Sequence, residues 1–465
     1  MIVLKVVSVQ KYQDFVILVL ENLVLGPPAV TLTIDDPEYY DKYAPGDLFD
    51  MTLVEKFQLS DPIPEPTPDP IPDPAPSPTP TPTPTPGLDP ANRAWYVDSA
   101  AVDGGDGSEG APCNSFEQVA GYWQNGNYIT GELRGGDHLY IIGTFYAGQH
   151  VEGVKNMTLH LNRGTQGGTI DNPTRIIGVN AVFDGQYVAQ DLVKIAALSN
   201  DPIESVVISG ITVTNAVGRG MFIDDYVLNS EVKSCSFTDT RGNPSLGAGG
   251  GLTVAVLRDV RHHSINNCSF SGNYQTQSFS ANNNLGGLTI LSEPGADPTS
   301  SVTVINNAFN DEINAIRHKH SGNIHMSAHS NTFTNIINAF YIRALSNDIF
   351  NNIITGCTTA FYAEAESQGG NSDIQLTGNV VNAMKFLDTG NSQTTFARRI
   401  AIAENDYIGP PTPSILLGQW SSNKYNLADF VSNGGNTFTT SEPVIVHEGV
   451  TLNFADVMHP TDQIV

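Results

Sequence analysis

Two cationic side chains, Lys319 and Arg343, stand 24 positions apart in short stretches that alternate apolar and polar residues. If the chain coils once in about that many residues, their backbones stack at ~4.8 Å and both side chains project from one wall. Such a pair suits eliminative cleavage of a uronic acid, which needs a base for the C5 proton and a donor for the departing oxygen. The charges of Arg317 and Arg343 would depress the pKa of Lys319, as a base requires.

Oxygen-bearing side chains precede this pair and could hold a cation that neutralises the sugar carboxylate. Glu312 and Asn314 lie on alternate positions just before Lys319, and one of Asn282, Asn283 and Asn284 could supply a third ligand. Carboxylate and amide oxygens suit calcium. That Glu312 and Asn314 hold calcium is an implication of the family resemblance given next.

The stretch from Asp311 to Gly356 resembles the core of polysaccharide lyase family six, which includes alginate lyases and chondroitinase B. The resemblance rests on Glu312-x-Asn314, on Ile316-Arg317-His318-Lys319-His320 and on Ile342-Arg343-Ala344-Leu345. It implies that Lys319 is the catalytic base, Arg343 the catalytic arginine and Glu312 a calcium ligand. The chain departs from the family pattern at Asn314, where the family has an acid, and at Ala344 and Leu345, where it has His and Gly.

Further polar and aromatic side chains nearby are predicted to contact the sugar: Arg317, His320, Tyr341, Glu364 and Glu366. Glu364 and Glu366 share a strand face by alternation, so this pair could also serve glycoside hydrolysis. The alternative to a catalytic or sugar-binding role is that these residues belong to solvated strands and carry their charges on the surface without taking part in chemistry. The histidines of this region show no accompanying carboxylate pattern for a metal.

A recurring phrase of the form Asn-x-Phe or Asn-x-Ile identifies the elements that position these residues. The copies are Cys235-Ser236-Phe237, Asn267-Cys268-Ser269-Phe270, Asn307-Ala308-Phe309, Asn331-Thr332-Phe333, Asn352-Ile353-Ile354 and Asn379-Val380-Val381. Short alternating strands at this period, without a helical pattern between them, predict a solenoid. We interpret it as a right-handed parallel β-helix in which the Phe side chains stack inside, while each Asn adopts the left-handed turn conformation and bonds locally.

The chain divides into three segments by composition. Residues 1–58 carry alternating runs typical of about five antiparallel strands, and we predict a small β domain that anchors the protein. Residues 59–93 contain proline at every second position from Pro62 to Pro86, which favours a stiff polyproline II rod of roughly 75 Å, although a plain disordered tether fits as well. Residues 94–465 form the predicted β-helix with capping ends.

The opening of the third segment resembles the start of many carbohydrate-active β-helices. The shared features are Tyr96-Val97-Asp98, the acidic loop Asp103–Gly107 and the strand from Gly136 to Tyr146. In those proteins a short capping helix covers the first turn, as solenoids require. The acidic loop more often turns the chain than binds calcium.

Charge, cysteine content and hydropathy limit the partners and environments that we expect for this chain. The 22 basic and 48 acidic residues give a formal charge of -26, which disfavours nucleic acid and also opposes an anionic polysaccharide unless a local cation reverses the field. Cys113, Cys235, Cys268 and Cys357 show no zinc spacing, and we expect Cys235 and Cys268 to stack inside. No run is apolar enough to span a bilayer, and the first residues do not read as a signal peptide.

These features together predict a virion-attached β-helix of the tailspike or fibre type. Residues 1–58 would bind other virion proteins, and the β-helix would recognise a bacterial surface or marine polysaccharide and cleave it by β-elimination. The alternatives are a non-catalytic glycan-binding adhesin and a structural decoration protein of the virion. A homotrimer is a further expectation, although no coiled-coil heptad supports it.

Overall fold

A computed structural model covers the chain, and its contacts divide the chain into two units, Met1–Thr83 and Pro84–Val465. The structure describes residues 2–11, 16–22, 30–34, 48–51 and 92–465. Within the last range it leaves out 125–126, 147–157, 188–190, 241–248, 258–259, 274–284, 293–295, 320–323, 343–345, 364–371, 390–397, 411–412, 418–426, 440–443 and 448. The predicted proline rod lies outside the described residues.

The described part of the first unit is a single antiparallel sheet. Strand β1 (Ile2–Lys11) pairs with β2 (Val16–Asn22) and with β4 (Leu48–Met51), and β2 pairs with β3 (Val30–Ile34), all antiparallel. The sheet order is therefore β3-β2-β1-β4. An antiparallel β domain was predicted here, and these four strands are its described part.

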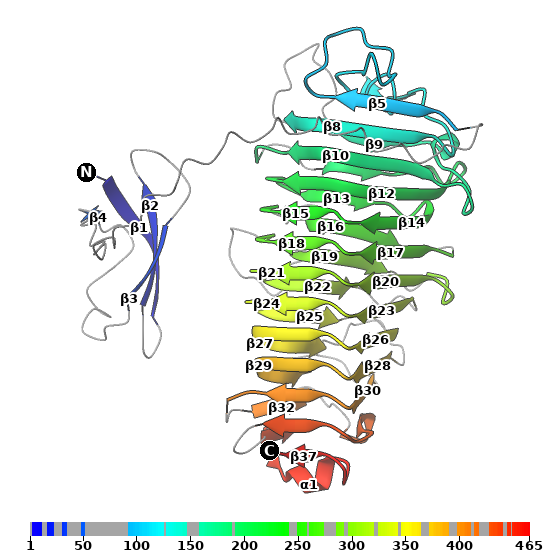
Figure 1. Ribbon diagram of the computed structural model, residues 1–465. Coiled ribbons are helices and arrows are strands. Elements are labelled where there is room, and N and C mark those ends of the chain that lie inside the picture. Colours follow the sequence, from blue (N-terminus) through cyan, green and yellow to red (C-terminus); the bar gives the residue numbers. More distant parts are fainter. Residues whose placement is uncertain are drawn as a thin grey trace, which may run out of the picture. The chain divides into compact units, whose positions relative to one another are not determined.

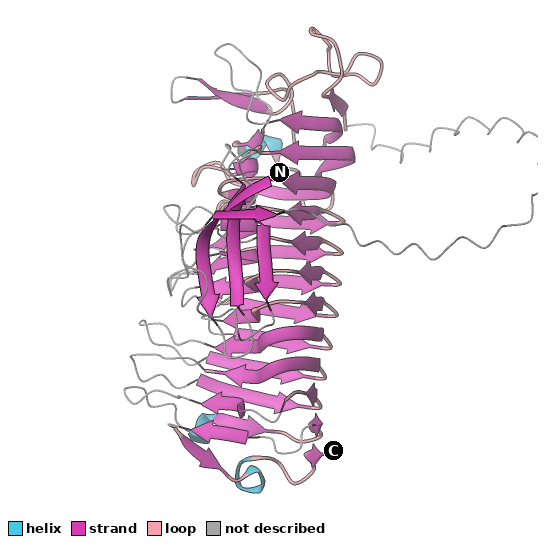
Figure 2. Ribbon diagram, turned by 90° about the vertical axis from the view of Figure 1, so that its left-hand side faces the viewer, coloured by secondary structure: helices cyan, strands magenta, loops and turns pink. Residues whose placement is uncertain are grey.

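The second unit is a right-handed parallel β-helix, as the repeats predict. Each coil of the chain, here called a rung, places strands on three faces, and each strand pairs with its counterpart one rung later (Figure 1). The view along the side of the stack shows the strands lying in register over the length of the unit (Figure 2). Short polar turns separate the faces, which is why no helical segment is needed between strands.

The stack begins with the short strand β5 (Ala94–Asp98), and the next rungs use long strands that run across the first and second faces. These long strands are β8 (His138–Tyr146), β10 (Thr174–Asp184) and β12 (Ile203–Thr214), and a hairpin of β6 (Gly121–Gln124) and β7 (Asn127–Thr130) accompanies them. The capping helix expected by resemblance is absent from the described residues of this region. A single turn stands in its place, in which the N–H of Ala120 donates to the carbonyl of Phe116 at 2.8 Å.

The first face continues from β12 through eight strands: β14 (Val227–Lys233), β17 (His262–Asn266), β20 (Ser301–Ile305), β23 (His325–His329), β26 (Ser346–Phe350), β28 (Ser372–Thr377), β30 (Arg398–Ala403) and β33 (Phe430–Ser432). The second face holds β15 (Ser236–Thr238), β18 (Ser269–Ser271), β21 (Ala308–Asn310), β24 (Thr332–Thr334), β31 (Asp406–Ile408), β34 (Thr437–Thr439) and β37 (Gln463–Ile464).

The third face holds β9 (Leu159–Leu161), β11 (Asp191–Ile195), β13 (Arg219–Ile223), β16 (Gly249–Val256), β19 (Leu285–Ser292), β22 (Asn314–Lys319), β25 (Asn338–Ile342), β32 (Pro413–Leu417) and β35 (Val444–His447). Strands β27 (Ile353–Ala363) and β29 (Val380–Asp388) span the second and third faces. At the C-terminal end β36 (Val450–Leu452) turns back on β35, followed by the short helix α1 (Phe454–Val457).

Two short 3-10 helices complete the described secondary structure, at Gly164–Gln166 and Leu427–Asp429. The part of the chain that the structure describes contains no helix long and apolar enough to cross a membrane.

The phenylalanines of the repeat stack inside the β-helix, as predicted. Phe237, Phe270, Phe309 and Phe333 are at most 1% exposed, and their successive ring centroids lie 4.9, 4.6 and 5.0 Å apart with nearly parallel planes. The rung spacing of a parallel sheet sets this distance, and each stacked pair adds to the burial of apolar area. The same column continues through Ile354 and Val381 on the register of β24, β27 and β29.

The asparagines of the repeat behave differently from the prediction. From Asn307 onward the motif residue is buried and bonds between rungs rather than locally, in a ladder of Asn307, Asn331, Asn352, Asn379, Asn405 and Asn436 that ends on Asp462. The left-handed conformation belongs to the preceding residue, as at Asn306, Ser330 and Asn351. Asn267 adopts the predicted left-handed conformation, because in its rung the ladder position is Cys268, but its side-chain amide donates to Ser234 of the preceding rung rather than locally.

The stacked cysteines were predicted correctly. Cys235 and Cys268 are each 2% exposed and occupy equivalent positions in consecutive rungs. All four cysteines of the chain are free and buried. Cys235 and Cys268 act as small interior side chains at the turn before the second face.

Candidate functional site

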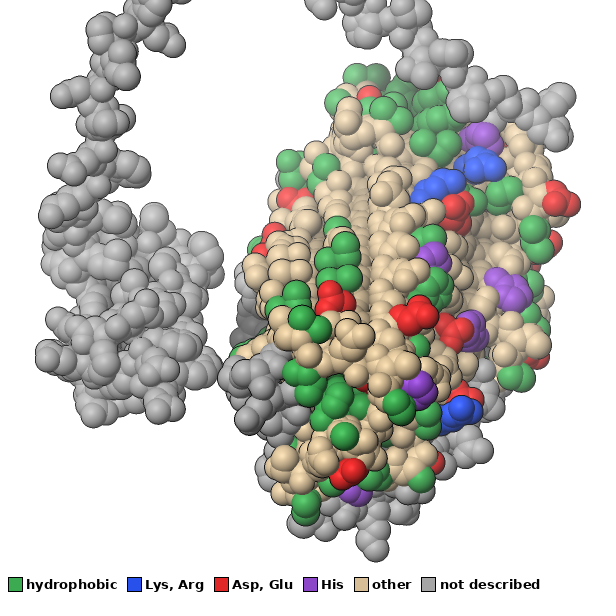
Figure 3. Space-filling model, turned by 60° about the horizontal axis from the view of Figure 1, so that its bottom comes forward, with side chains coloured by type: hydrophobic (Ala, Val, Ile, Leu, Met, Phe, Trp, Pro, Cys, Tyr) green, Lys and Arg blue, Asp and Glu red, His purple; other side chains and the backbone are tan. Residues whose placement is uncertain are grey.

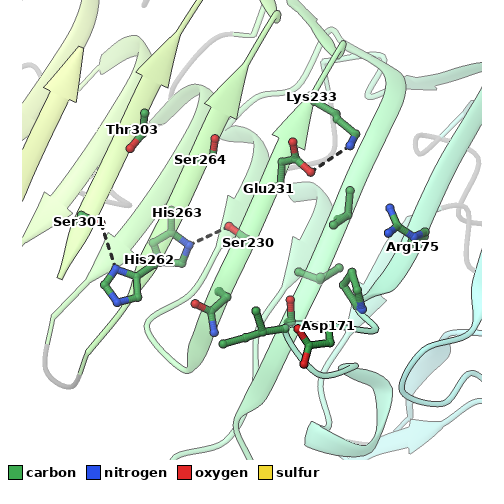
Figure 4. A pocket seen from close by; sticks show the side chains of 16 residues that line it. Asp171, Arg175, Ser230, Glu231, Lys233, His262, His263, Ser264, Ser301 and Thr303 are labelled. Atoms are coloured by element: carbon green, nitrogen blue, oxygen red, sulfur yellow. Dashed lines mark hydrogen bonds and ion pairs between the residues drawn. The ribbon is translucent and has the colours of Figure 1, made fainter. Parts of the chain in front are cut away.

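A polar groove of about 470 Å³ lies on the outer side of the first face, over β10, β12, β14, β17 and β20. Charged, hydroxyl and imidazole side chains line it (Figure 4). A volume of this size is in the range of ligand-binding clefts. We take this groove as the candidate functional site.

Strand alternation aims these side chains outward in columns along the axis. In β14 Ser230 and Val232 point into the core, whereas Glu231 and Lys233 point out. Parallel register then aligns one outward column of Arg175, Val207, Glu231, Ser264 and Thr303. Each rung therefore presents one new side chain to the groove at the rung spacing.

The charged groups of the groove are partly paired. Nζ of Lys233 lies 3.0 Å from Oε2 of Glu231, and the two side chains are 38% and 33% exposed. Nδ1 of His262 lies 3.0 Å from Oγ of Ser301 at the edge. The guanidinium of Arg175 projects near the N-terminal end of the groove, apart from the other labelled charges (Figure 4).

A buried hydroxyl and imidazole support the floor of the groove from inside. Oγ of Ser230 and Nδ1 of His263 lie 2.7 Å apart, and His263 is 3% exposed. Burial, and then the positive charge of Arg261, lower the pKa of His263 to about 3. The imidazole is therefore neutral at physiological pH and acts as part of the core rather than as an acid or base.

The polar surface continues along the first face below the groove. Oδ2 of Asp348 lies 3.4 Å from Nε2 of His325, and the imidazole of His329 stacks on Phe350 at 4.5 Å. In the space-filling view, charged and histidine side chains gather along the right-hand side, over the first face, beside rows of uncharged polar groups (Figure 3). An extended ligand thus finds polar partners over several rungs.

The third face carries the residues predicted from the sequence. Arg317 is fully buried, and its guanidinium carbon lies 4.9 Å from the ring centroid of Tyr341, its register partner in β25. Tyr341 stacks in turn on Tyr362 at 5.0 Å. The structure therefore joins Arg317 and Tyr341 in one outward column, but places Arg317 beneath the surface, so it is a packing partner of Tyr341 rather than an exposed contact.

The predicted catalytic pair is only partly described. Lys319 is the last residue of β22, and its backbone pairs with Leu291; its side chain lies outside the described residues. Arg343 also lies outside them, as do His320, Glu364 and Glu366. The roles of these five residues stay predictions.

The predicted calcium ligands have other partners. Glu312 is 3% exposed, and its Oε1 accepts from Nδ2 of Asn273 at 2.7 Å, while burial raises its pKa well above the usual range. The amide oxygen of Asn314 accepts from Asn338 at 2.9 Å. Oε1 of Glu312 and Oδ1 of Asn314 are thus engaged within the protein, whereas Oε2 of Glu312 is buried without a hydrogen-bond partner among the described residues.

No cluster of three or more His, Cys, Asp or Glu suited to a metal occurs in the described part of the chain, which includes the loop from Asp103 to Gly107. Calcium binding therefore stays an untested prediction of the sequence, and no step of a mechanism is assigned to it here.

Sequence reasoning missed the groove. Its residues come from five strands spread over more than 130 positions, from Ile170 to Thr303, and no single stretch resembles a motif. The one signal was the alternating polar pattern Glu231-Val232-Lys233 and its equivalents in later rungs. That pattern predicts which side chains point outward but not how rungs align.

Comparison with known proteins yields structural neighbours only. No protein-family model and no curated protein matches the chain. A crystal structure of the pectate lyase Pel9A matches with a TM-score of 0.36 and 12% identity over 69% of this chain and 76% of that one. A structure titled Geobacillus virus E2 ORF18 matches with a TM-score of 0.35 and 11% identity, over 66% of this chain and 54% of that one.

Proposed function

We propose that this β-helix is a carbohydrate-recognition protein that holds a polysaccharide along the groove of the first face. The observation that carries the proposal is the outward column of Glu231, Ser264 and Thr303, which repeats polar partners at the rung spacing. A polysaccharide also repeats its hydroxyl groups along one direction. A shallow site with regular donors and acceptors suits such a polymer better than a compact metabolite.

The charge of the groove supports the same class of ligand. The chain has a formal charge of -26, yet the groove contains Arg175 and Lys233 together with Glu231 and Asp171. The local field is therefore close to balanced and does not repel a neutral or anionic glycan.

Blocking the groove tests the proposal. The full-length chain is screened on a glycan array, and the affinity for each ligand found is then measured by calorimetry. Ser264→Trp fills the groove from an outward position without entering the core, and we expect it to weaken binding roughly 10-fold or more, about 1.4 kcal/mol. Thr334→Trp, at an exposed position of the second face, is the matched control.

Equal binding by the two tryptophan variants would contradict the location in the groove. Absence of any glycan ligand for the unmodified protein would overturn the proposed function itself.

A second candidate function is eliminative cleavage at the third face by Lys319 and Arg343. The specific observation in its favour is register: Arg317 pairs with Tyr341 and His318 with Ile342, an offset of 24 residues that Lys319 and Arg343 share. In this proposal Lys319 takes the C5 proton of a uronic acid while Arg343 faces the sugar carboxylate. The C5 electron pair forms a C4=C5 double bond, the C4–O bond to the neighbouring sugar breaks, and the departing oxygen takes a proton from water. His320, Tyr341, Glu364 and Glu366 would contact neighbouring sugar units.

Incubation with alginate, chondroitin and bacterial capsule, followed by ultraviolet absorbance of unsaturated chain ends, tests the lyase proposal. Lys319→Ala and Arg343→Ala are expected to abolish product formation, whereas Arg399→Ala, an exposed arginine of the first face, should not. Product formation that survives Lys319→Ala would exclude Lys319 as the base.

We further propose that residues 1–58 attach the protein to a virion and that the β-helix is presented outside it. The division of the chain into two units and the intervening proline-rich segment support an anchored module on a spacer. Deletion of residues 1–58 should give particles that lack the protein on immunoblots. Particles that retain it after the deletion would refute the anchor.

A further inference from the structure

The outward columns of the groove continue toward the N-terminal cap. His138 in β8 is the register partner of Arg175, and Tyr140 in the same strand is the partner of Tyr96 in β5. The rings of Tyr96 and Tyr140 stack at 4.8 Å with an angle of 12° between their planes. The ring of His138 lies 6.4 Å from that of Tyr140. His138 and Tyr140 thus lie in the strand that pairs with that of Arg175, next to the residues that line the groove.

Two of these side chains carry polar atoms that nothing in the described structure satisfies. Nδ1 of His138 and the hydroxyl of Tyr140 are buried and have no hydrogen-bond partner among the described residues, although the two residues are only 8% and 9% exposed. Buried polar groups in folded proteins are almost always paired, and leaving one unpaired costs about 1–3 kcal/mol. Two orphaned groups on one outer strand indicate a missing partner.

The guanidinium of Arg175 adds a third donor. It has no carboxylate or carbonyl partner in the described part of the chain, in contrast to Arg219, whose Nε and Nη2 contact both oxygens of Asp191 at 2.8 and 2.7 Å. Arg175 lines the groove, and its planar fork matches the geometry of a bidentate oxyanion.

The protonation states agree with a set of donors. Burial, and then the charge of Arg175, lower the pKa of His138, so the ring is neutral and can place its single proton on Nδ1. Burial, and then the negative charge of Glu109, raise the pKa of Tyr140, so the hydroxyl keeps its proton. All three groups therefore carry a proton that they can donate at neutral pH.

We propose that Arg175, His138 and Tyr140 form a subsite for the anionic substituent of a sugar unit, a carboxylate or a sulfate ester, at the N-terminal end of the groove. This proposal rests on the proposed function, because the remainder of the polymer lies in the groove described above. It resolves the objection raised by the charge of the chain, since the guanidinium reverses the field where the anion binds.

The site also contains one opposing charge. Glu109 is exposed, and its carboxylate acts on both Tyr96 and Tyr140. An anion in the subsite feels its repulsion, so Glu109→Gln is expected to strengthen binding of the anionic polymer by a few-fold at low salt. Glu109→Gln is thus expected to change the affinity in the direction opposite to the loss expected for Arg175→Ala.

The test measures the affinity of the full-length protein for two matched pairs of polymers. Polygalacturonate is compared with its carboxyl-reduced form, and dextran sulfate with dextran. We expect one anionic polymer to bind and its neutral counterpart to bind more weakly. Binding of polygalacturonate would identify the anion as a carboxylate, and binding of dextran sulfate would identify it as a sulfate ester. Arg175→Ala should weaken anionic binding by roughly 10-fold to 100-fold.

Tyr140→Phe provides the sharper variant. The hydroxyl has no partner in the described structure, so its removal should leave the melting temperature unchanged or slightly raised while weakening anionic binding several-fold. If the Tyr140 hydroxyl had only a structural role, its removal would not weaken anionic binding while leaving the melting temperature unchanged. Arg399→Ala removes the same charge from β30 of the same face and should leave affinity unchanged.

Two outcomes overturn the subsite, and they are distinguishable. If Arg175→Ala and Tyr140→Phe bind like Arg399→Ala while Ser264→Trp fails to bind, the groove is correct and the anionic subsite is wrong. If the unmodified protein binds neither polymer pair and no member of the glycan array, the proposed function fails and the subsite fails with it.

Discussion

The side-chain amide of Asn331 donates to Oδ1 of Asn352 at 3.0 Å, and that oxygen also accepts the backbone N–H of Asn331. The second N–H of the Asn331 side-chain amide donates to the carbonyl of Val304 at 3.0 Å. Each ladder asparagine therefore ties three consecutive rungs together at the turn between the first and second faces. The ladder satisfies backbone groups in a turn that contains no strand hydrogen bonds of its own.

Asn331→Ala is expected to destabilise the β-helix by about 3 kcal/mol or more, because it leaves the backbone N–H of Asn307 and one N–H of its side-chain amide buried without an acceptor. Chemical denaturation monitored by circular dichroism measures the change. Asn382→Ala, at an exposed position of β29, should change stability by less than ~0.5 kcal/mol. Equal effects of the two substitutions would show that the ladder contributes little.

The buried imidazole of His263 predicts a loss of stability in acid. Its pKa is lowered from 6.5 to about 3, so in this window the unfolded chain binds a proton that the folded chain does not. The contribution of His263 to stability is therefore full above pH 6.5 and is lost as the pH drops toward 3. His263→Gln should flatten this dependence in thermal melts, whereas His262→Gln, at the exposed neighbour, should not. An unchanged slope in His263→Gln would contradict the assignment.

Glu312 predicts the opposite dependence. Burial raises its pKa in the folded state, so the folded chain holds a proton that the unfolded chain releases above about pH 4.5. Its contribution is present in acid and is lost as the pH rises. Glu312→Gln keeps the bond to Asn273 without an ionisable group. Its melting temperature should exceed that of the unmodified protein by more at pH 8 than at pH 4.

The same melts decide the calcium prediction. With Glu312 in the interior, neither added calcium nor a chelator should move the melting temperature. A calcium-dependent increase that disappears in Glu312→Gln would instead support the ligand role that the sequence suggested.

The four cysteines should be unreactive in the native protein. All are buried and free, and burial raises the pKa of Cys357 to about 11, which disfavours the reactive thiolate. A thiol reagent such as 5,5′-dithiobis(2-nitrobenzoate) should titrate none of them before denaturation and four after it. Rapid labelling of the folded chain would show that a cysteine is more accessible than described here.

The amino-acid sequence by itself determined the fold class. The recurring Phe237, Phe270, Phe309 and Phe333, preceded by alternating strands, leave few arrangements other than a coil of parallel strands with an aromatic column inside. The period of the repeat also fixed which residues share a column. The burial of Cys235 and Cys268 followed from their place in that period.

Only the tertiary structure decided where polar groups go and what they contact. The sequence could not reveal that Glu312 turns inward to Asn273, or that Asn306 rather than Asn307 takes the left-handed conformation. It also could not bring His138 and Arg175, 37 positions apart, side by side in neighbouring strands. The physical reason is that a repeat fixes the spacing of residues along the chain, whereas burial and partner choice depend on the register between rungs, which is a long-range property.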